Sequence, residues 1–232
     1  MKKYRNEWKY CCLESQLKLL DCRLKNLLKL DSHSGSNGKY VVHSLYFDDF
    51  KDRCAKENEA GDFKRFKWRI RYYDNSYESI HLEYKEKLFG MCYKKSCPIT
   101  KDEYSKLLVC DVLDIFWNTD KDLLKKFCID IMNKNFTPKV IIDYERRAYI
   151  DLNTNIRITL DTNISAAYNF EKFLSNDYAK YPLQDKNYHI LEVKFDDILP
   201  GYIKNIVSSY NFIQISFSKY YLGRKKLEEV LR

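Results

Sequence analysis

The chain has 232 residues, of which 45% are hydrophobic and 32% charged, a composition that is typical of a globular protein and excludes a disordered one. Lys and Arg number 41 against 33 Asp and Glu, so the formal net charge of +8 favours a phosphate-bearing or other anionic partner. A membrane-spanning helix and a signal peptide are not expected, because no segment approaches roughly 18 consecutive apolar residues and the N-terminus leads into charged sequence.

The first half of the chain is predicted to consist mainly of strands. Strands are predicted at 4–10, 41–48, 64–73, 79–88 and 91–97, where apolar and polar residues alternate. A helix is predicted at about 13–30, because its leucines recur at helical spacing. The turn at 74–76 makes a hairpin of its two neighbouring strands, whereas 49–61 is expected to be irregular.

The second half mixes helices and strands. Helices are predicted from the capping box Thr100-x-x-Glu103 to about 109, at 120–134, and from Pro200 to about 209. Strands are predicted at 139–150, 155–161 and 188–196, with a polar, tyrosine-rich excursion at 166–187. Segment 211–220 fits more than one structure, and Gly223 is expected to precede a short amphipathic tail. No internal repeat or linker is evident, so we expect a single α+β domain over 1–232.

The eight cysteines indicate whether the protein works in a reducing or an oxidising cellular compartment. They include no Cys-x-x-Cys pair and no nearby histidine at zinc-binding spacing. In a lysine-rich chain without a secretion signal, we expect reduced thiols that pack like small apolar side chains. The sequence therefore predicts a cytoplasmic protein.

Charged residues recur at every second position of the predicted strands. Lys67, Arg69 and Arg71 share one strand face, and Trp68, Ile70 and Tyr72 share the other. The same alternation groups Glu83, Lys85 and Lys87 on one strand, and Glu192 and Lys194 on another. Like charges on paired strands repel unless an anion lies between them, so we expect a surface that binds a polyanion. If the sheet closes, this surface is the inside of a barrel.

Each of these patterns also has a plain structural interpretation. A single Arg-x-Arg is more often an exposed strand face than a ligand site, and Glu-x-Lys is often only a solvated pair. The chain shows no Gly-rich phosphate loop, no metal-binding histidine spacing and no Cys/His nucleophile pair. Phosphate would therefore be bound by Lys and Arg side chains, and Glu192 is the carboxylate suited to a nucleotide-borne divalent metal.

The charged motifs occur in an order that resembles a known family. They are Arg5-x-Glu7-x-Lys9-Tyr10, Ser44-Leu45-Tyr46-Phe47-Asp48, Lys67-x-Arg69-x-Arg71, Leu82-Glu83-x-Lys85, Tyr144-x-Arg146-x-Ala148, Arg157-Ile158-Thr159-Leu160-Asp161, Leu191-Glu192-Val193-Lys194 and Ser218-Lys219-Tyr220. This set resembles the VTC domain, the polyphosphate polymerase branch of the CYTH-like triphosphate tunnel metalloenzymes. The likeness spans about 4–223.

The resemblance implies a closed antiparallel β-barrel tunnel with a cationic lumen and helices packed outside. It implies that ATP and inorganic polyphosphate are the partners, that Mn²⁺ or Mg²⁺ is the cofactor, and that the γ-phosphate is transferred onto a growing polyphosphate chain. The implied phosphate ligands are Lys9, Arg69, Arg71, Lys85, Arg146, Arg157, Lys194 and Lys219, assisted by Ser218. Glu192 would bind the metal, and a further lysine would be Lys94 or Lys95. Lys87, Glu7 and Glu83 complete the expected substrate-binding set.

Two positions depart from the family pattern. Arg5 replaces the first acid of an E-x-E-x-K motif, so a second metal site is not expected. Ser216 stands where the fungal polymerase has a lysine, which removes one cation. The membrane helices of fungal relatives have no counterpart in this sequence, so attachment to the inner face of a membrane would need a separate membrane protein.

Three other functions remain open from the sequence. A tripolyphosphatase or nucleoside triphosphatase would use the same scaffold, with Glu7 or Glu83 orienting water. A non-catalytic polyphosphate or inositol-phosphate binding module would bind without metal and without turnover. Single-stranded RNA binding is suggested by the 20 Tyr and 13 Phe among basic residues, but the chain lacks an RNP-type aromatic motif, so no nucleic-acid partner is expected. The oligomeric state is not indicated.

Overall fold

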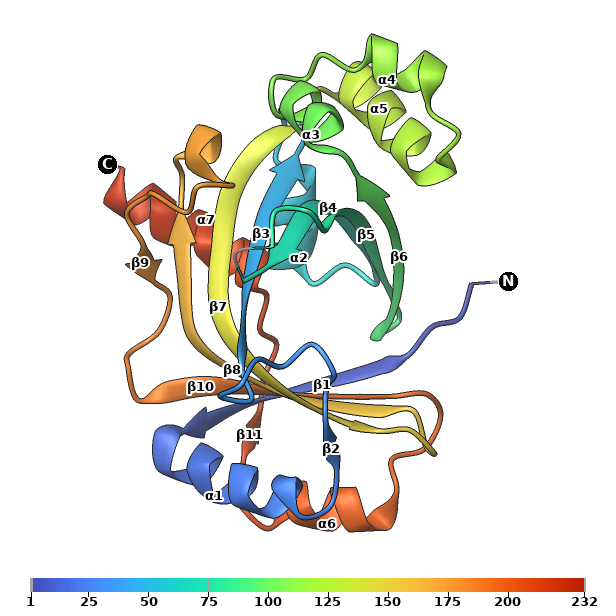
Figure 1. Ribbon diagram of the computed structural model, residues 1–232. Coiled ribbons are helices and arrows are strands. Elements are labelled where there is room, and N and C mark those ends of the chain that lie inside the picture. Colours follow the sequence, from blue (N-terminus) through green and yellow to red (C-terminus); the bar gives the residue numbers. More distant parts are fainter. Residues whose placement is uncertain (1, 75, 232) are drawn as a thin grey trace.

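The structure, a computed structural model, describes residues 2–74 and 76–231. Its centre is a strongly curled antiparallel sheet of eleven strands (Figure 1). The strands are β1 Asn6–Leu13, β2 Lys29–Leu30, β3 Tyr40–Asp48, β4 Lys64–Tyr73, β5 Ile80–Leu88, β6 Met91–Ile99, β7 Thr137–Asp151, β8 Ile156–Ala167, β9 Tyr181–Pro182, β10 Tyr188–Phe195 and β11 Ile213–Gln214. Their spatial order is β11-β1-β10-β8-β7-β3-β4-β5-β6, with β2 on β7 and β9 on β8.

The curl brings the two ends of this order together. Backbone hydrogen bonds of 2.9 and 2.8 Å join Arg5, just before β1, to Cys92 of β6. On the same edge of β1, the extended segment after β11 continues the wall, because the Ile215 N–H donates to the Lys9 carbonyl at 2.9 Å. The α+β tunnel architecture predicted above is therefore confirmed, with a seam between β1 and β6 that contains few backbone bonds.

Seven helices accompany the sheet within the described residues. They are α1 Glu14–Lys25, α2 Arg53–Ala60, α3 Lys101–Leu108, α4 Leu113–Asn118, α5 Asp122–Lys134, α6 Gly201–Ser208 and α7 Lys219–Val230, with a 3₁₀ turn at Phe170–Lys172. None of the helices in 2–74 and 76–231 is long and apolar enough to cross a membrane.

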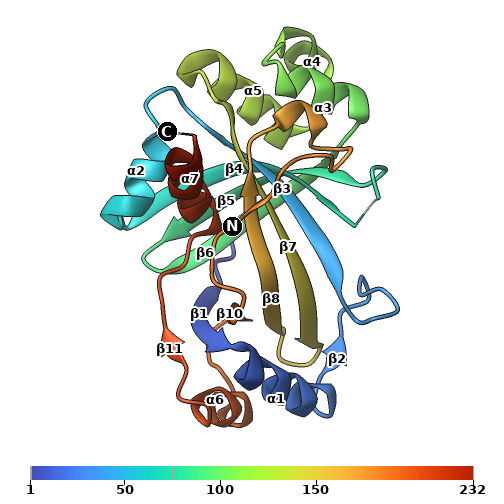
Figure 2. The same ribbon diagram turned by 90° about the vertical axis from the view of Figure 1, so that its left-hand side faces the viewer.

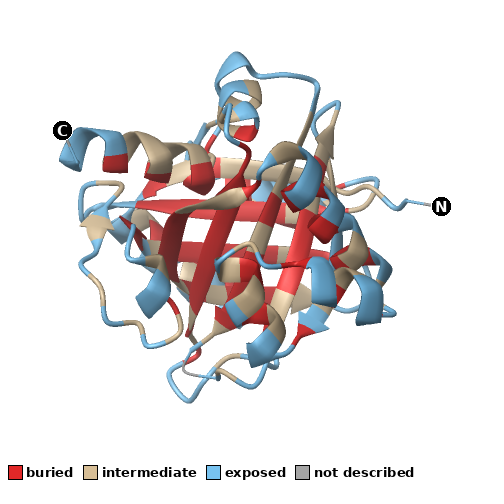
Figure 3. Ribbon diagram, turned by 90° about the horizontal axis from the view of Figure 1, so that it is seen from above, coloured by how far each residue is buried: buried red, intermediate tan, exposed pale blue. Residues whose placement is uncertain are grey.

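Two apolar cores hold helices against the outer face of the sheet, one at each end of the molecule (Figures 1 and 2). At one end, Phe127 of α5 packs against Trp68 of β4 and Phe47 of β3, with ring centroids 4.7 and 5.1 Å apart. At the other, leucines of α1 pack with β10 side chains such as Leu191. Figure 3 shows the resulting burial along the strands. Because alternate residues pack outward here, their neighbours must point into the lumen.

Helix α7 packs against β7 and β8 on the lumen side, and Gly223 permits this contact. A Cβ at position 223 would lie 2.3 Å from Ile142 Cδ1 and 3.1 Å from Val140 Cγ2. The prediction that Gly223 precedes a short tail is therefore wrong, since this glycine lies inside α7. Because Gly223 has no side chain, α7 can lie close to β7 and β8. This close packing places Lys219, at the start of α7, in the lumen.

Other boundaries also differ from the prediction. Helix α2 occupies part of the segment predicted as irregular, and the Asp48 carboxylate accepts hydrogen bonds from the N–H groups of Cys54 and Ala55 at 3.0 Å. Only Cys54 of α2 is buried, so its sequence lacks an apolar stripe. Strand β8 extends to Ala167, well into the expected excursion, and α1 ends at Lys25.

Candidate active site

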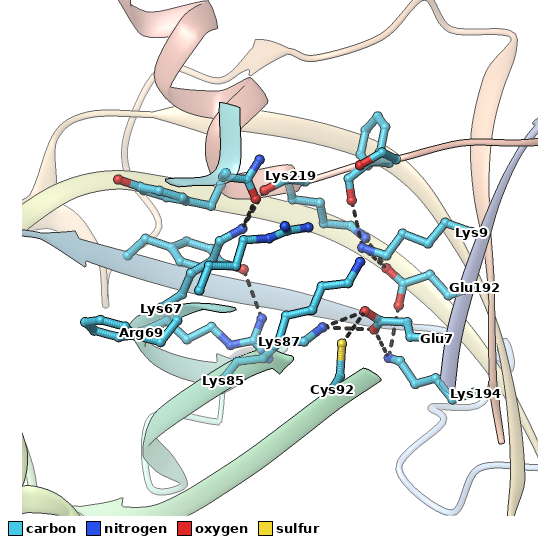
Figure 4. A pocket seen from close by; sticks show the side chains of 18 of the residues that line it. Glu7, Lys9, Lys67, Arg69, Lys85, Lys87, Cys92, Glu192, Lys194 and Lys219 are labelled. Carbon is cyan, nitrogen blue, oxygen red and sulfur yellow. Dashed lines mark hydrogen bonds and ion pairs between the residues drawn. The ribbon is translucent and has the colours of Figure 1, made fainter. Parts of the chain in front are cut away.

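The curled sheet encloses a cavity of about 120 Å³. Twenty-one residues line it, of which ten are Lys or Arg and two are glutamates (Figure 4). The lining cations are Lys9, Arg65, Lys67, Arg69, Arg71, Lys85, Lys87, Arg146, Lys194 and Lys219. The cavity is therefore strongly cationic, as a site for a polyanion must be.

Strand register places these cations opposite one another. On β4 and β5, Lys67 lies across from Lys85, and Arg69 lies across from Glu83. On β1 and β10, Glu7 lies across from Lys194 and Lys9 from Glu192. The predicted alternation thus holds on all four strands, and the charged faces meet around one space.

Arg69 and Arg71 are held by hydrogen bonds to neighbouring side chains, of which Tyr46 and Tyr144 also line the cavity. Arg69 donates to Glu83 at 2.7 Å and to the Tyr46 hydroxyl at 2.9 Å. Arg71 donates to Ser44 Oγ at 3.0 Å and to the Tyr144 hydroxyl at 3.1 Å. These bonds leave part of each guanidinium for a ligand and restrict its rotamers, which reduces the entropy lost on binding.

The Glu83 carboxylate is ionised in this environment. Burial raises its pKa, but Arg69, Arg71 and Lys94 together outweigh burial and hold the pKa of Glu83 well below its ordinary value. An ionised Glu83 keeps Arg69 oriented and is a weak base.

Glu192 is surrounded by cations from four elements. Its carboxylate lies 2.9 Å from Lys219 Nζ, 3.0 Å from Lys194 Nζ, 3.4 Å from Lys9 Nζ and 3.6 Å from Arg146. Burial raises the pKa of Glu192, but the positive field of Lys194 and the other cations holds it well below its ordinary value. The group is therefore a permanent carboxylate inside a cationic site.

A second buried carboxylate, Asp161 of β8, binds two of the cations on this side of the cavity. Arg146 donates to its two oxygens at 2.6 and 2.7 Å, and Lys219 donates to it at 2.6 Å. Burial raises the pKa of Asp161, and Arg146 and Lys219 lower it by more. Asp161 fixes the positions of two cations that face the cavity.

Glu7 and Lys85 form an ion pair across the seam. Lys85 Nζ lies 2.9 Å from both carboxylate oxygens, and the Cys92 thiol lies 3.3 Å from one of them. Burial raises the pKa of Glu7, but Lys85, Lys9 and Lys194 hold it well below its ordinary value. This pair joins β1 to β5 where backbone bonding is sparse.

With this geometry established, comparison with known proteins identifies the family. The VTC domain family matches residues 4–228. The chain belongs to the VTC domain family. No curated protein matches it.

Solved structures agree on the fold of this VTC domain. The candidate adenylyl cyclase HpAC1 from Hippeastrum, described as having a dominant triphosphatase activity, is 14% identical and superposes with a TM-score of 0.58, covering 97% of this chain and 96% of its own. A candidate adenylate cyclase from Bacillus halodurans is 12% identical with a TM-score of 0.52, covering 94% and 95%. Both comparisons support the triphosphate tunnel fold.

Most of the predicted site residues line the VTC cavity. They are Glu7, Lys9, Arg69, Arg71, Lys85, Lys87, Arg146, Glu192, Lys194, Ser218 and Lys219. Glu83 lies directly behind Arg69 and is buried.

Three predicted site residues of the VTC domain are not among the residues that line the cavity. Arg157 lies beside Lys194 in register, but its guanidinium pairs with Asp31 and donates to the Tyr40 hydroxyl at 2.9 Å. Lys94 pairs with Glu83 at 2.9 Å. Lys95 lies across from Tyr84, so it is on the outer face of β6 and does not line the cavity. Of the two alternatives for the further lysine, Lys94 is therefore on the lumen side.

Several lining residues were not predicted as ligands. Lys67 stands on the predicted charged face, so strand alternation alone could have included it. Asp161 is not a lining residue but holds the lining cations Arg146 and Lys219, and it follows from Arg157 by the same alternation. Asn58 could not have been found, because it lies on α2, where no helix was predicted.

The carboxylates of the VTC cavity fit a metal shared with the phosphates of a ligand better than a metal held by protein alone. Within 2–74 and 76–231, no group of three or more His, Cys, Asp or Glu side chains gathers to hold an ion. Mg²⁺ and similar ions often use one or two carboxylates together with substrate phosphates. Glu192 offers ionised oxygens in the cavity, and Glu7 lies near enough for the two carboxylates to affect each other's charge.

Proposed function

We propose that this VTC domain is a metal-dependent polyphosphate polymerase that transfers the γ-phosphate of ATP onto a growing inorganic polyphosphate chain inside the tunnel. The observation that supports this most directly is the cavity inside the curled sheet with ten lining cations. A polyanion matches its charge. Membership of the VTC domain family points the same way.

Phosphate groups would bind by replacing internal partners of the cations. Lys85, Lys194 and Lys219 each contact a carboxylate in the free protein. A phosphate oxygen makes the same kind of charge-assisted bond, so the exchange keeps each cation paired. The lysine side chains are long and flexible, so they can turn from the carboxylates to the ligand as it enters the cavity.

Positioning and charge stabilisation account for the chemistry. Phosphoryl transfer passes through a loose transition state with charge spread over the oxygens of the transferred group. Arg69 and Arg71, braced by Glu83, Ser44 and Tyr144, would bind these oxygens without reorganising. A divalent metal, when bound with the nucleotide, supplies further neutralisation of phosphate charge, and Glu192 would hold it.

The acid–base properties of the cavity favour a phosphate acceptor over water. A terminal phosphate of a polyphosphate chain is largely ionised near neutral pH, so transfer to it needs no strong base. Water must be deprotonated, and the pKa values of Glu7, Glu83 and Glu192 all lie well below the ordinary value. Carboxylates with such low pKa values are poor general bases.

The experiment is incubation of the purified domain with ATP and Mn²⁺, followed by gel analysis for long polyphosphate and an assay for orthophosphate. Long chains that accumulate with ADP support the polymerase. Orthophosphate without long chains supports the tripolyphosphatase alternative, which the activity described for HpAC1 of Hippeastrum favours. Binding of polyphosphate in metal-free buffer with no turnover would make the domain a binding module and overturn both enzymes.

A further inference from the structure

The lining cations of the cavity fall into two groups. Seven have a carboxylate oxygen within 4.0 Å, namely Lys9, Arg69, Arg71, Lys85, Arg146, Lys194 and Lys219. Arg65, Lys67 and Lys87 also line the cavity, but they make no such ion pair with any described residue. The positive charge of this second group is therefore not balanced within the described part of the chain.

Strand register concentrates the unbalanced charge. Arg65 lies directly across from Lys87, and Lys67 lies directly across from Lys85, on neighbouring positions of β4 and β5. Like charges directly opposite on paired strands are destabilising. Of these four cations, Lys85 has a counter-charge in Glu7. The other three therefore form a patch that an incoming anion would stabilise.

Lys67 has neutral hydrogen-bond partners in place of an acid. Its Nζ donates to Asn58 Oδ1 at 2.8 Å and to Ser218 Oγ at 2.6 Å, and it lies 5.4 Å from the centre of the Tyr220 ring. Both oxygens come from segments outside the sheet, α2 and the N-terminus of α7. They hold the amine at the cavity surface without neutralising it.

The charged groups around Lys67 disfavour its ammonium form. They are Lys9 of β1, Lys85 of β5 and Arg65 of its own strand, whereas the Cys54 thiol of α2 acts weakly in the opposite direction. Burial lowers the pKa of Lys67, and the three cations lower it further, to well below the ordinary value. A bound phosphate would reverse this effect and favour the charged amine.

The two groups of cations suit two different ligands. A nucleotide that carries a divalent metal needs a carboxylate to complete the coordination of that metal, and Glu192 lies among the paired cations. Phosphates without a metal bind most readily to cations that have no carboxylate to displace. Figure 4 shows Lys67 on the opposite side of the cavity from Glu192.

We propose that Arg65, Lys67 and Lys87 form an acceptor subsite that binds the metal-free terminal phosphates of the polyphosphate chain, while the metal-bearing nucleotide binds on the Glu192 side. This inference rests on the proposed polymerase function and specifies which cations serve the acceptor. Ser218 and Asn58 orient Lys67 within this acceptor subsite. A hydrolase, whose acceptor is water, has no use for such a subsite.

The test compares binding of two ligands by titration calorimetry. Tripolyphosphate in buffer with EDTA probes the acceptor subsite, and ATP with Mn²⁺ probes the nucleotide side. Lys67→Gln and Lys87→Gln should each weaken tripolyphosphate binding by about tenfold, the low end of a charge-assisted hydrogen bond. Binding of ATP with Mn²⁺ should stay within about twofold of the wild type. Lys64→Gln, at an exposed lysine that does not line the cavity, is the matched control and should change neither.

Glu192→Gln supplies the reciprocal result. It should weaken binding of ATP with Mn²⁺ and leave metal-free tripolyphosphate binding unchanged or tighter. The acceptor subsite is overturned if the lysine variants lose affinity equally for both ligands, or if they lose affinity for neither ligand. It is also overturned if the wild type does not bind metal-free tripolyphosphate. If the division of binding holds but no long polyphosphate is made, the subsite stands and the polymerase proposal fails.

Discussion

Lys85 of β5 and Glu7 of β1 form an ion pair, at 2.9 Å to both carboxylate oxygens, across the seam where the curled sheet closes. The same lysine faces the cavity, so a phosphate ligand and Glu7 compete for it. Closure of the wall and occupancy of the cavity are therefore linked through one side chain.

Glu7→Gln should destabilise the free domain and make its stability depend on ligand. Removing Glu7 leaves Lys85 without its partner, and breaking a largely buried pair in this way costs about 3 kcal/mol. Tripolyphosphate should restore most of that loss, because a phosphate oxygen replaces the carboxylate. Urea unfolding with and without tripolyphosphate measures both effects. Glu86→Gln is the control, since Glu86 pairs with Lys2 on the outer side of the seam and a cavity ligand should not rescue it.

Arg69→Ala and Arg71→Ala should abolish most polymer synthesis while the domain stays folded. Each removes a braced phosphate contact, which is about 2–4 kcal/mol of transition-state stabilisation, or about 10²–10³ in rate. Initial rates of polyphosphate formation and a circular dichroism melt of each variant measure the two outcomes. Arg23→Ala, on the exposed side of α1, should keep the wild-type rate. Unchanged rates in the Arg69 and Arg71 variants would remove them from the site.

Glu192→Gln should remove the dependence of activity on divalent metal. Its carboxylate is ionised and lies among four cations, so an amide in its place would no longer attract a metal ion. The measurement is a Mn²⁺ titration of the rate, with Glu86→Gln as a control for loss of a buried acid outside the cavity. A variant that Mn²⁺ still stimulates as strongly as the wild type would place the metal elsewhere.

Gly223→Ala should destabilise the domain through overpacking between α7 and β7. The new Cβ would lie 2.3 Å from Ile142 Cδ1, and such crowding typically costs about 1–3 kcal/mol. Ile142→Val removes that methyl group, so the double variant should be more stable than the sum of the single effects predicts. Thermal unfolding of the four proteins measures the coupling. Strict additivity would show that Gly223 serves another purpose.

Binding of metal-free tripolyphosphate should tighten as pH falls from alkaline values, partly because of Lys67. The pKa of Lys67 is lowered in the free protein, and an adjacent phosphate raises it again. The complex therefore binds more protons than the free protein between these two pKa values, and affinity is lost as pH rises through that window. Calorimetry in buffers of different ionisation enthalpy counts the protons taken up. Lys67→Gln should reduce that number, and an identical number in wild type and variant would contradict the assignment to Lys67.

Much of the lumen was predictable because strand geometry is local. Residues two apart on β4 share a face whatever the rest of the chain does, so Arg69 and Arg71 followed directly from the sequence. The apolar residues between them, such as Trp68 and Ile70, indicated which face would be buried against helices. By contrast, α2 was missed, because one buried residue in eight gives no periodic signal.

The sequence by itself determined which side chains point into the tunnel, because alternation along a strand depends only on neighbouring residues. The tertiary structure decided which of those cations are neutralised. Arg157 pairs with Asp31, and Lys94 pairs with Glu83. Lys67 instead donates hydrogen bonds to the neutral groups of Asn58 and Ser218, and Ser218 lies 151 positions away along the chain. Such pairings depend on how distant segments pack, and the energy of a buried charge depends on those partners.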